Sequence, residues 1–268
     1  MTPVHDTRKN QLLAALPEAD WLRWLPDLER VELPLGKVLY EPGSSLSHVV
    51  FPTTALVSLQ YVTEDGAPSG IAVVGAEGMI GIALFMGGET MASRAVVQCA
   101  GWGYRLSGRV LKAEFGEPTV QPLLLRYTQA LMTQMALTAV CNRHHTLHRQ
   151  LCRWLLLSLD RVQGNELLMT HELIANMLGV RREGVTEAAL KLQVAGLIRY
   201  ARGRITVLDR GALEARTCEC YAVVRKEYDR LLPERARIPS VPAPVGGRPF
   251  HQRPFSRVGL TVNQRVPD

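Results

Sequence analysis

Short apolar runs separated by turn residues dominate the chain from about residue 31 to residue 115. Runs such as 38–40, 49–51 and 71–74 are only three or four residues long, and glycines such as Gly66 stand between them. Short strands with regular turn signals are typical of a β-sandwich or a small barrel. Because such a body can enclose a cavity at one end, we expect a ligand-sensing module. A purely structural barrel is the alternative.

The pattern changes from Pro118 to about Asn142, where no glycine occurs and apolar positions follow helical spacing. One stripe at 4,3,4,3 spacing is Leu124, Thr128, Leu131, Met135 and Thr138, and an adjacent stripe is Leu123, Tyr127, Ala130 and Leu137. An apolar face this wide must be covered on two sides. We therefore predict one long helix that packs on the β-body and on the same helix of a second chain. Burial of both sides within a single chain is the alternative.

Residues 170 to 198 fit a helix-turn-helix. The spacing predicts a helix over 171–178 and a second over roughly 181–195, and Gly179 supplies the backbone freedom for the sharp turn between them. Thr170 can cap the first helix by accepting a hydrogen bond from a free backbone N–H. The positions expected to be buried where the two helices meet are Ile174, Ala175, Leu178, Val180, Val185 and Ala188.

The second of these helices begins with Arg181, Arg182 and Glu183, which suit contact with bases. Arginine can bond both acceptors on the guanine edge, and glutamate can accept from the cytosine amino group. Residues 197–208 then predict two short strands about an Arg-Gly-Arg turn, which is a wing. The window 180–205 holds six basic and two acidic residues, a net charge of +4, and phosphate contacts need such an excess.

We therefore predict a DNA-binding surface, with an amphipathic helix pair that never meets DNA as the alternative. The candidate DNA-contacting residues are Thr170, Arg181, Arg182, Glu183, Thr186, Glu187, Lys191, Arg202 and Arg204.

Composition agrees with a globular intracellular protein. The chain has 268 residues, of which 47% are hydrophobic, which is enough for roughly two domains. No apolar run approaches the ~20 residues of a membrane span, and the N-terminus lacks an export segment, so we predict the cytoplasm and no membrane partner. Five scattered cysteines do not form a disulfide framework.

The net charge of +6 comes mostly from the C-terminal end of the chain. Residues 235–268 contribute +5, from six arginines and one aspartate, and their proline content predicts a disordered tail.

No catalytic or metal-binding pattern stands out. His48 is the only histidine between residues 31 and 115, and no phosphate-binding glycine loop or nucleophile elbow occurs. Cys141, His145, His148 and Cys152 are spaced 4, 3 and 4, but on a helix they would span ~16 Å, too far for one tetrahedral ion. We interpret them as a helical stripe or an interdomain hinge. The pair Cys218-x-Cys220 is interpreted as structural and without partners.

A glycine-rich roll, a long connecting helix and a winged helix-turn-helix, in this order, resemble the Crp/Fnr family of bacterial transcription regulators over about residues 20 to 225. The most specific part is 179–185, which is similar to the entry of the family's recognition helix. The resemblance implies that Arg182 and Glu183 contact bases. The family usually has another arginine four residues after that glutamate, where this chain has Glu187.

The implied fold is α+β, with an N-terminal β-roll sensor domain (double-stranded and jelly-roll-like), a long dimerisation helix and a C-terminal winged helix-turn-helix domain. The expected divisions are an N-terminal helical segment 1–30, a cyclic-nucleotide-binding-like β-roll 31–117, a connecting and dimerisation helix 118–145, the DNA-binding domain 146–234 and the tail 235–268.

The resemblance also bears on the ligand. Residues 77–81 resemble the family's Gly-Glu-Leu-Gly turn, whose glutamate holds a ribose hydroxyl, but Met79 stands at that position. The phosphate-binding arginine of the family precedes a Ser-Ala, and here Arg94 falls a few residues late. A buried phosphate without a cationic partner is costly, so we expect that cyclic AMP does not bind tightly. The first cysteine is Cys99, so the N-terminal cysteines of iron–sulfur members are absent and no such cluster is expected. The weak ligand candidates are Gly78, Met79, Gly81 and Arg94.

Together these features predict a transcription regulator that binds a near-palindromic site on double-stranded DNA as a homodimer, through the 118–145 helix, with an unidentified effector and no enzymatic activity. RNA polymerase is a further partner if the protein is an activator. The alternative is a ligand-sensing regulatory module that acts through protein–protein contacts, and a roll-type metalloenzyme is a third class.

Overall fold

The computed structural model describes residues 4–232, so the predicted tail 235–268 lies outside the described residues. The N-terminal segment is helical, with η1 (Val4–Lys9), α1 (Gln11–Ala15), α2 (Glu18–Trp24) and η2 (Leu25–Asp27). Asn10 caps α1, because its side-chain oxygen accepts from the Leu12 and Leu13 amides at 3.1 and 3.2 Å. Its amide nitrogen donates to Pro52 O and Gly78 O at 2.9 and 2.8 Å, which ties this segment to the roll.

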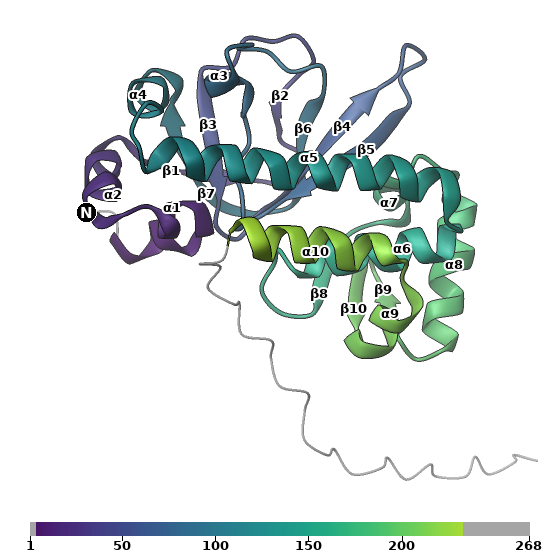
Figure 1. Ribbon diagram of the computed structural model, residues 1–268. Helices are drawn as coiled ribbons and strands as arrows, with labels where there is room; N and C mark the ends of the chain where they lie inside the picture. The colour runs from purple at the N-terminus through teal and green to yellow at the C-terminus, as the bar shows by residue number, and fades with distance from the viewer. Residues whose placement is uncertain (1–3, 233–268) are drawn as a thin grey trace, which may run out of the picture. The chain divides into compact units, whose positions relative to one another are not determined.

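The predicted β-sandwich is confirmed, and it consists of two antiparallel sheets (Figure 1). One has the order β1-β7-β3, with β1 (Glu29–Leu33), β7 (Gly101–Ser107) and β3 (His48–Pro52). The other has the order β2-β6-β4-β5, with β2 (Val38–Tyr40), β6 (Arg94–Cys99), β4 (Leu56–Val62) and β5 (Pro68–Val74). Two short helices, α3 (Ala83–Met86) and α4 (Gly108–Glu114), complete the roll. Phe51 and Tyr104, paired across β3 and β7, are fully buried, so the core lies between the sheets.

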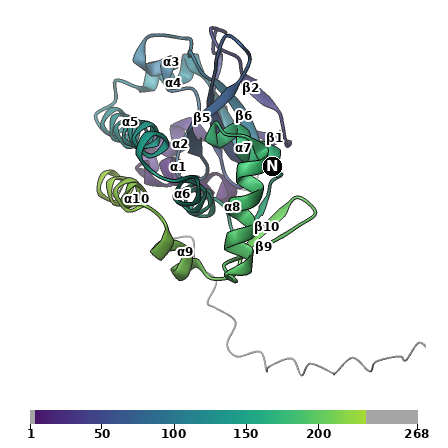
Figure 2. The same ribbon diagram turned by 90° about the vertical axis from the view of Figure 1, so that its right-hand side faces the viewer.

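The long helix α5 (Val120–His144) has the predicted extent, but its wide apolar face is buried differently from the expectation. It packs on β5 and on α10 (Glu219–Leu231), which lies alongside it in both views (Figures 1 and 2). Residues of both predicted stripes are buried or half-buried within this one chain. The second side of this face is covered by α10 of the same chain, which was the alternative, and a homodimer through this helix stays a prediction. The described apolar side chains that α5 leaves exposed are Pro122, Leu125, Met132, Ala136, Ala139 and Val140.

The C-terminal part contains the predicted winged helix-turn-helix, preceded by α6 (Leu147–Leu159). Its elements are β8 (Glu166–Leu168), α7 (His171–Leu178), α8 (Arg182–Val194), β9 (Ile198–Ala201), β10 (Arg204–Val207) and α9 (Arg210–Arg216). Gly179 ends α7 with a φ of 64°, and the wing turns at Arg202 and Gly203 with φ of 51° and 73°. The positions expected at the helix–helix contact are buried, except that Val180 is half-buried. No helix among residues 4–232 is long and apolar enough to cross a membrane.

Candidate nucleic-acid interface

The first turn of α8 presents the predicted base-contacting side chains to solvent. Val185, Ala188, Ala189 and Leu192 are buried and hold the helix against α6 and α7. The opposite face is exposed. It carries Arg182, Glu183, Thr186 and Leu190, and Arg181 precedes it as the N-cap residue. Helical spacing of the buried residues therefore decides which side chains can meet a DNA groove.

Contacts between α7, α8 and the wing make one continuous surface. The His171 ring stacks on Tyr200 of β9, with ring centroids 4.0 Å apart, and its Nδ1 lies 3.0 Å from the Thr186 hydroxyl of α8. The Met169 amide donates to Gly203 O at 2.7 Å, which holds the wing turn beside the start of α7. Burial and the nearby Arg182 charge lower the pKa of His171. The wing and α8 lie side by side in Figure 2.

Positive charge on this surface is largely uncompensated. Arg181, Arg182, Arg199 and Arg202 form no ion pair within residues 4–232. Such side chains are free to contact phosphates.

The other predicted DNA-contacting residues already have partners within the chain. Lys191 pairs with Glu187 at 2.7 Å, and Arg204 pairs with Glu166 of β8. Thr170 accepts from the Leu173 amide at 3.2 Å, which confirms its predicted role as N-cap. Arg199 and His171 were not among the candidates. Arg199 could have been found from the sequence, because polar and apolar residues alternate along the predicted strand and place its side chain on the exposed face. No sequence pattern predicts that His171 stacks on Tyr200.

The four weak ligand candidates do not meet in one pocket. A Cβ on Gly78 would lie 2.5 Å from the Tyr127 ring, and Met79 is fully buried. Gly81 serves a turn with a φ of 98°. Arg94 forms an ion pair with Glu41 at 2.7 Å. A cavity of about 250 Å³ lies elsewhere in the roll, and none of the four lines it. Its lining includes Lys37, Tyr40, Ser45, His48, Ile80 and Arg105.

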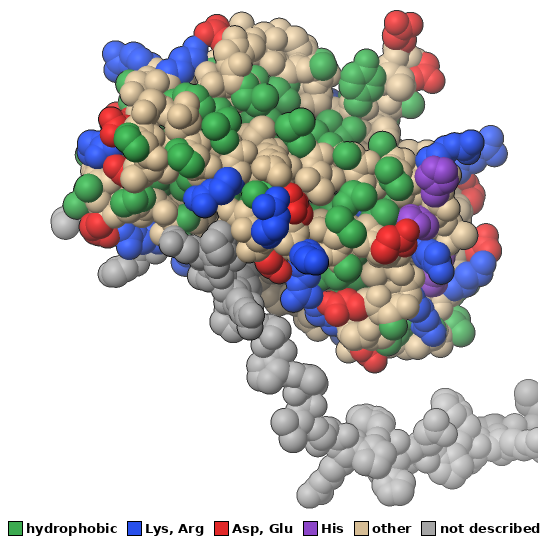
Figure 3. Space-filling model, in the orientation of Figure 1, with side chains coloured by type: hydrophobic (Ala, Val, Ile, Leu, Met, Phe, Trp, Pro, Cys, Tyr) green, Lys and Arg blue, Asp and Glu red, His purple; other side chains and the backbone are tan. Residues whose placement is uncertain are grey.

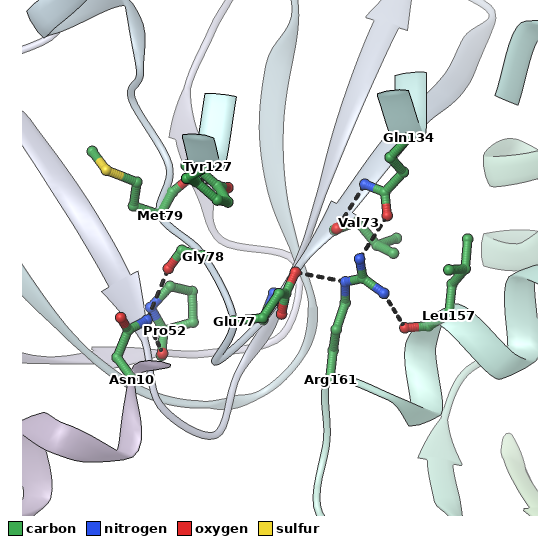
Figure 4. A network of polar contacts seen from close by, with 11 residues as sticks. Asn10, Pro52, Val73, Glu77, Gly78, Met79, Tyr127, Gln134, Leu157 and Arg161 are labelled. Carbon is green, nitrogen blue, oxygen red and sulfur yellow. Dashed lines mark hydrogen bonds and ion pairs between the residues drawn. The ribbon is translucent and has the colours of Figure 1, made fainter. Parts of the chain in front are cut away.

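A buried ion pair joins the turn at residues 77–81 to the segment that follows α6 (Figure 4). Arg161, just after α6, donates its Nε to a Glu77 carboxylate oxygen at 2.6 Å, and the two side chains are 2% and 0% exposed. Its other nitrogens donate to Gln134 Oε1 of α5 and to Leu157 O at 2.8 and 2.7 Å. The Gln134 amide nitrogen donates in turn to Val73 O of β5 at 3.0 Å. This network fixes the roll, α5 and α6 to one another.

The helix-turn-helix also touches the roll directly. Gly70 of β5 approaches Met177 of α7 so closely that a Cβ would lie 2.7 Å from the Met177 carbonyl oxygen. The Gln60 amide nitrogen of β4 lies 3.3 Å from the Met177 sulfur. The helix-turn-helix contacts the roll through α7, so Arg182 and Glu183 of α8 stay exposed.

A second group of polar side chains gathers where α5 ends and α10 begins. The ligand atoms of Cys141, His145, Cys218 and Cys220 all lie within 4.8 Å of one another. The interpretation of Cys218 and Cys220 as a pair without partners is therefore wrong, because α10 packs along α5 and brings them to its end. His148 and Cys152 are not part of this group. The chain leaves the helix at His145 and a new helix begins at Leu147, so 141–152 is not one helical stripe.

Comparisons with known proteins agree with this geometry. Residues 149–216 match the model of the Crp-like helix-turn-helix domain. No curated protein sequence matches the chain. Among solved structures, a Crp/Fnr-family regulator from Eubacterium rectale has a TM-score of 0.61 at 18% identity, over 78% of this chain and 98% of that one.

Two further structures show the same likeness. FixK2 from Bradyrhizobium japonicum has a TM-score of 0.62 at 16% identity, over 71% of this chain and 98% of that one. A CRP/FNR-family regulator from Thermus thermophilus has a TM-score of 0.55 at 24% identity, over 70% and 97% of the two chains. Residues 149–216 are therefore a Crp-like helix-turn-helix domain, and the chain shares its fold with solved regulators of the Crp/Fnr family.

Proposed function

We propose that this chain is a DNA-binding transcription regulator of the Crp/Fnr type that binds a near-palindromic duplex site as a homodimer. The first turn of α8 would lie in the major groove, and the wing would lie on the phosphate backbone. The supporting observation is the exposed pair Arg182 and Glu183 beside the unpaired cations Arg181, Arg199 and Arg202. A bidentate arginine and an accepting glutamate select bases, whereas the surrounding charge supplies affinity for any duplex. If the protein activates transcription, RNA polymerase is its further partner.

The homodimer rests on the apolar residues that α5 leaves exposed. Leu125, Met132 and Val140 follow helical spacing, so they lie along one side of the helix, and Met132 is 60% exposed. Hydrophobic side chains gather over α5 in Figure 3. Contact between two copies of this stripe would cover it and would place two α8 helices for half-sites about one helical turn apart.

Salt dependence and two arginine variants test the DNA proposal. For a duplex selected from a random pool, we expect affinity to fall steeply with salt, since each neutralised phosphate adds about −0.9 to the slope of log K against log salt. Arg182→Ala should cost about 1 to 3 kcal/mol of binding and relax selectivity at one base pair. Fluorescence anisotropy with the selected and single-mismatch duplexes measures both effects.

The matched control is Arg202→Ala, which removes an unpaired cation from the wing turn. It should weaken all duplexes about equally and make the salt slope shallower by about one phosphate. Identical behaviour of the two variants would refute the division between base and phosphate contacts. A flat salt response would favour regulation through protein–protein contacts instead.

Cyclic AMP is not expected to bind tightly. Arg94 is held by Glu41, and Met79 is buried where the resemblance places a ribose-binding carboxylate. A phosphate beside Met79 would lack Arg94 as its cationic partner, which is costly in a buried site. Isothermal titration of the full chain with cyclic AMP should show no binding at micromolar ligand, and clear micromolar heat would contradict this assignment.

A further inference from the structure

The side chains at the junction of α5 and α10 have the composition and spacing of a closed metal site. Cys141 is in the last turn of α5, and His145 follows one turn later. Cys218 is the N-cap residue of α10, and Cys220 is its second residue. The Cys141 and Cys218 sulfurs are 3.6 Å apart, and the Cys220 sulfur is 3.7 Å from His145 Nδ1. The three cysteines are buried, with Leu137 packed against them.

We propose that Cys141, His145 Nδ1, Cys218 and Cys220 bind a single zinc ion. Zinc takes four ligands in a tetrahedron, with Zn–S of about 2.3 Å and Zn–N of about 2.0 Å, so neighbouring ligand atoms should be about 3.5 to 3.8 Å apart. The two observed distances fall in that range. Three cysteines and one histidine are a ligand set of structural zinc sites, with no position open for substrate. A four-iron cluster would hold each ligand on a different iron and would need wider separations.

The second nitrogen of His145 supports this assignment. Its Nε2 lies 3.3 Å from a Glu219 carboxylate oxygen, while Nδ1 faces the cysteines. Metal-binding histidines commonly donate their other ring N–H to a carboxylate, which sets the tautomer and the ring orientation. Glu219 stands between Cys218 and Cys220, so the start of α10 supplies two sulfurs and also this carboxylate.

The charge around the site also fits a bound metal. Arg153 of α6 is 4% exposed, and it forms no ion pair with a carboxylate within residues 4–232. Its Nη2 donates only to the Thr138 hydroxyl, at 2.8 Å, and its Nε has no hydrogen-bond partner. Zinc with three thiolates and a neutral histidine has a net charge of −1, which this buried arginine would balance.

A metal ion at this site would link the C-terminal end of α5 to the N-terminal end of α10. Cys141 and Cys218 are separated by 77 residues, so one ion would close a long loop between α5 and α10. Closing a long loop reduces the entropy of the unfolded chain and therefore stabilises the folded one.

Metal content of the full chain tests the proposal. Protein expressed with added zinc and purified without chelator should contain about one zinc ion per chain by elemental analysis. Cys218→Ser should lose this zinc. Glu219→Gln changes an exposed side chain and should keep the fold but weaken zinc affinity about 10- to 100-fold, measured by competition with a chromogenic chelator. The matched control is Cys152→Ser, because Cys152 is a buried thiol of α6 outside the group, and it should retain full zinc.

Cobalt(II) supplies a readout that does not depend on any variant folding. Titration of the metal-free wild-type chain should give the intense visible bands of tetrahedral cobalt and a thiolate-to-cobalt charge-transfer band in the near ultraviolet. Absence of both zinc and the cobalt spectrum in the wild type would overturn the proposal. So would equal zinc in Cys218→Ser and wild type, a disulfide between Cys141 and Cys218 in freshly purified protein, or bound iron with inorganic sulfide.

Discussion

Arg161→Met should lower the free energy of unfolding by about 3 to 5 kcal/mol. The variant leaves the fully buried Glu77 carboxylate without its cation and also leaves Gln134 Oε1 without a donor. A buried charge without a partner costs far more than the pair contributes, because water can no longer solvate it. Chemical denaturation, followed by far-ultraviolet circular dichroism, measures the change.

The same substitution at an exposed pair is the control. Arg105 makes two hydrogen bonds to Glu29 across β7 and β1, at 2.7 and 2.8 Å, but both side chains are in contact with water. Arg105→Met should therefore cost less than about 1 kcal/mol. Removing both buried charges, in Glu77→Leu with Arg161→Met, should restore part of the lost stability. Equal losses at the buried and the exposed pair would show that the network around Arg161 does not hold the roll to α6.

Tyr228→Ala should cost about 3 to 5 kcal/mol of folding stability, the usual range for removing a fully buried large aromatic side chain. Tyr228 lies on the buried side of α10, and its ring centroid is 5.2 Å from the Arg161 guanidinium carbon. The variant therefore opens a cavity beneath α10 and removes a cation–π contact. If α10 forms part of the folded core in solution, the unfolding midpoint in denaturant should fall sharply.

Val223→Ala on the same helix is the matched control. Val223 is 47% exposed, so its truncation should change stability by no more than about 0.5 kcal/mol. A similar small effect for Tyr228→Ala would mean that α10 does not cover α5 in solution. In that case the wide face of α5 would again need a partner chain.

Local signals were enough to predict the DNA-binding unit. A capping threonine, a glycine at the turn and apolar residues at helical spacing each act within a few residues, so Thr170, Gly179 and the buried side of α8 could be placed from the sequence. The wing was predictable for the same reason, since two short strands about a glycine pair with each other. The sandwich followed from strand length and turn spacing, although its strand order did not.

Periodicity determined that α5 has a wide apolar face and that α8 exposes Arg182 and Glu183, because the spacing of side chains around a helix is a property of the helix itself. Only the tertiary structure decided what covers that face, which acid meets Arg161 and which side chains surround Cys218. These contacts join residues such as Glu77 and Arg161, 84 positions apart, and no local pattern records such a pairing. They depend on how α10, α6 and the roll pack, which is a property of the whole chain.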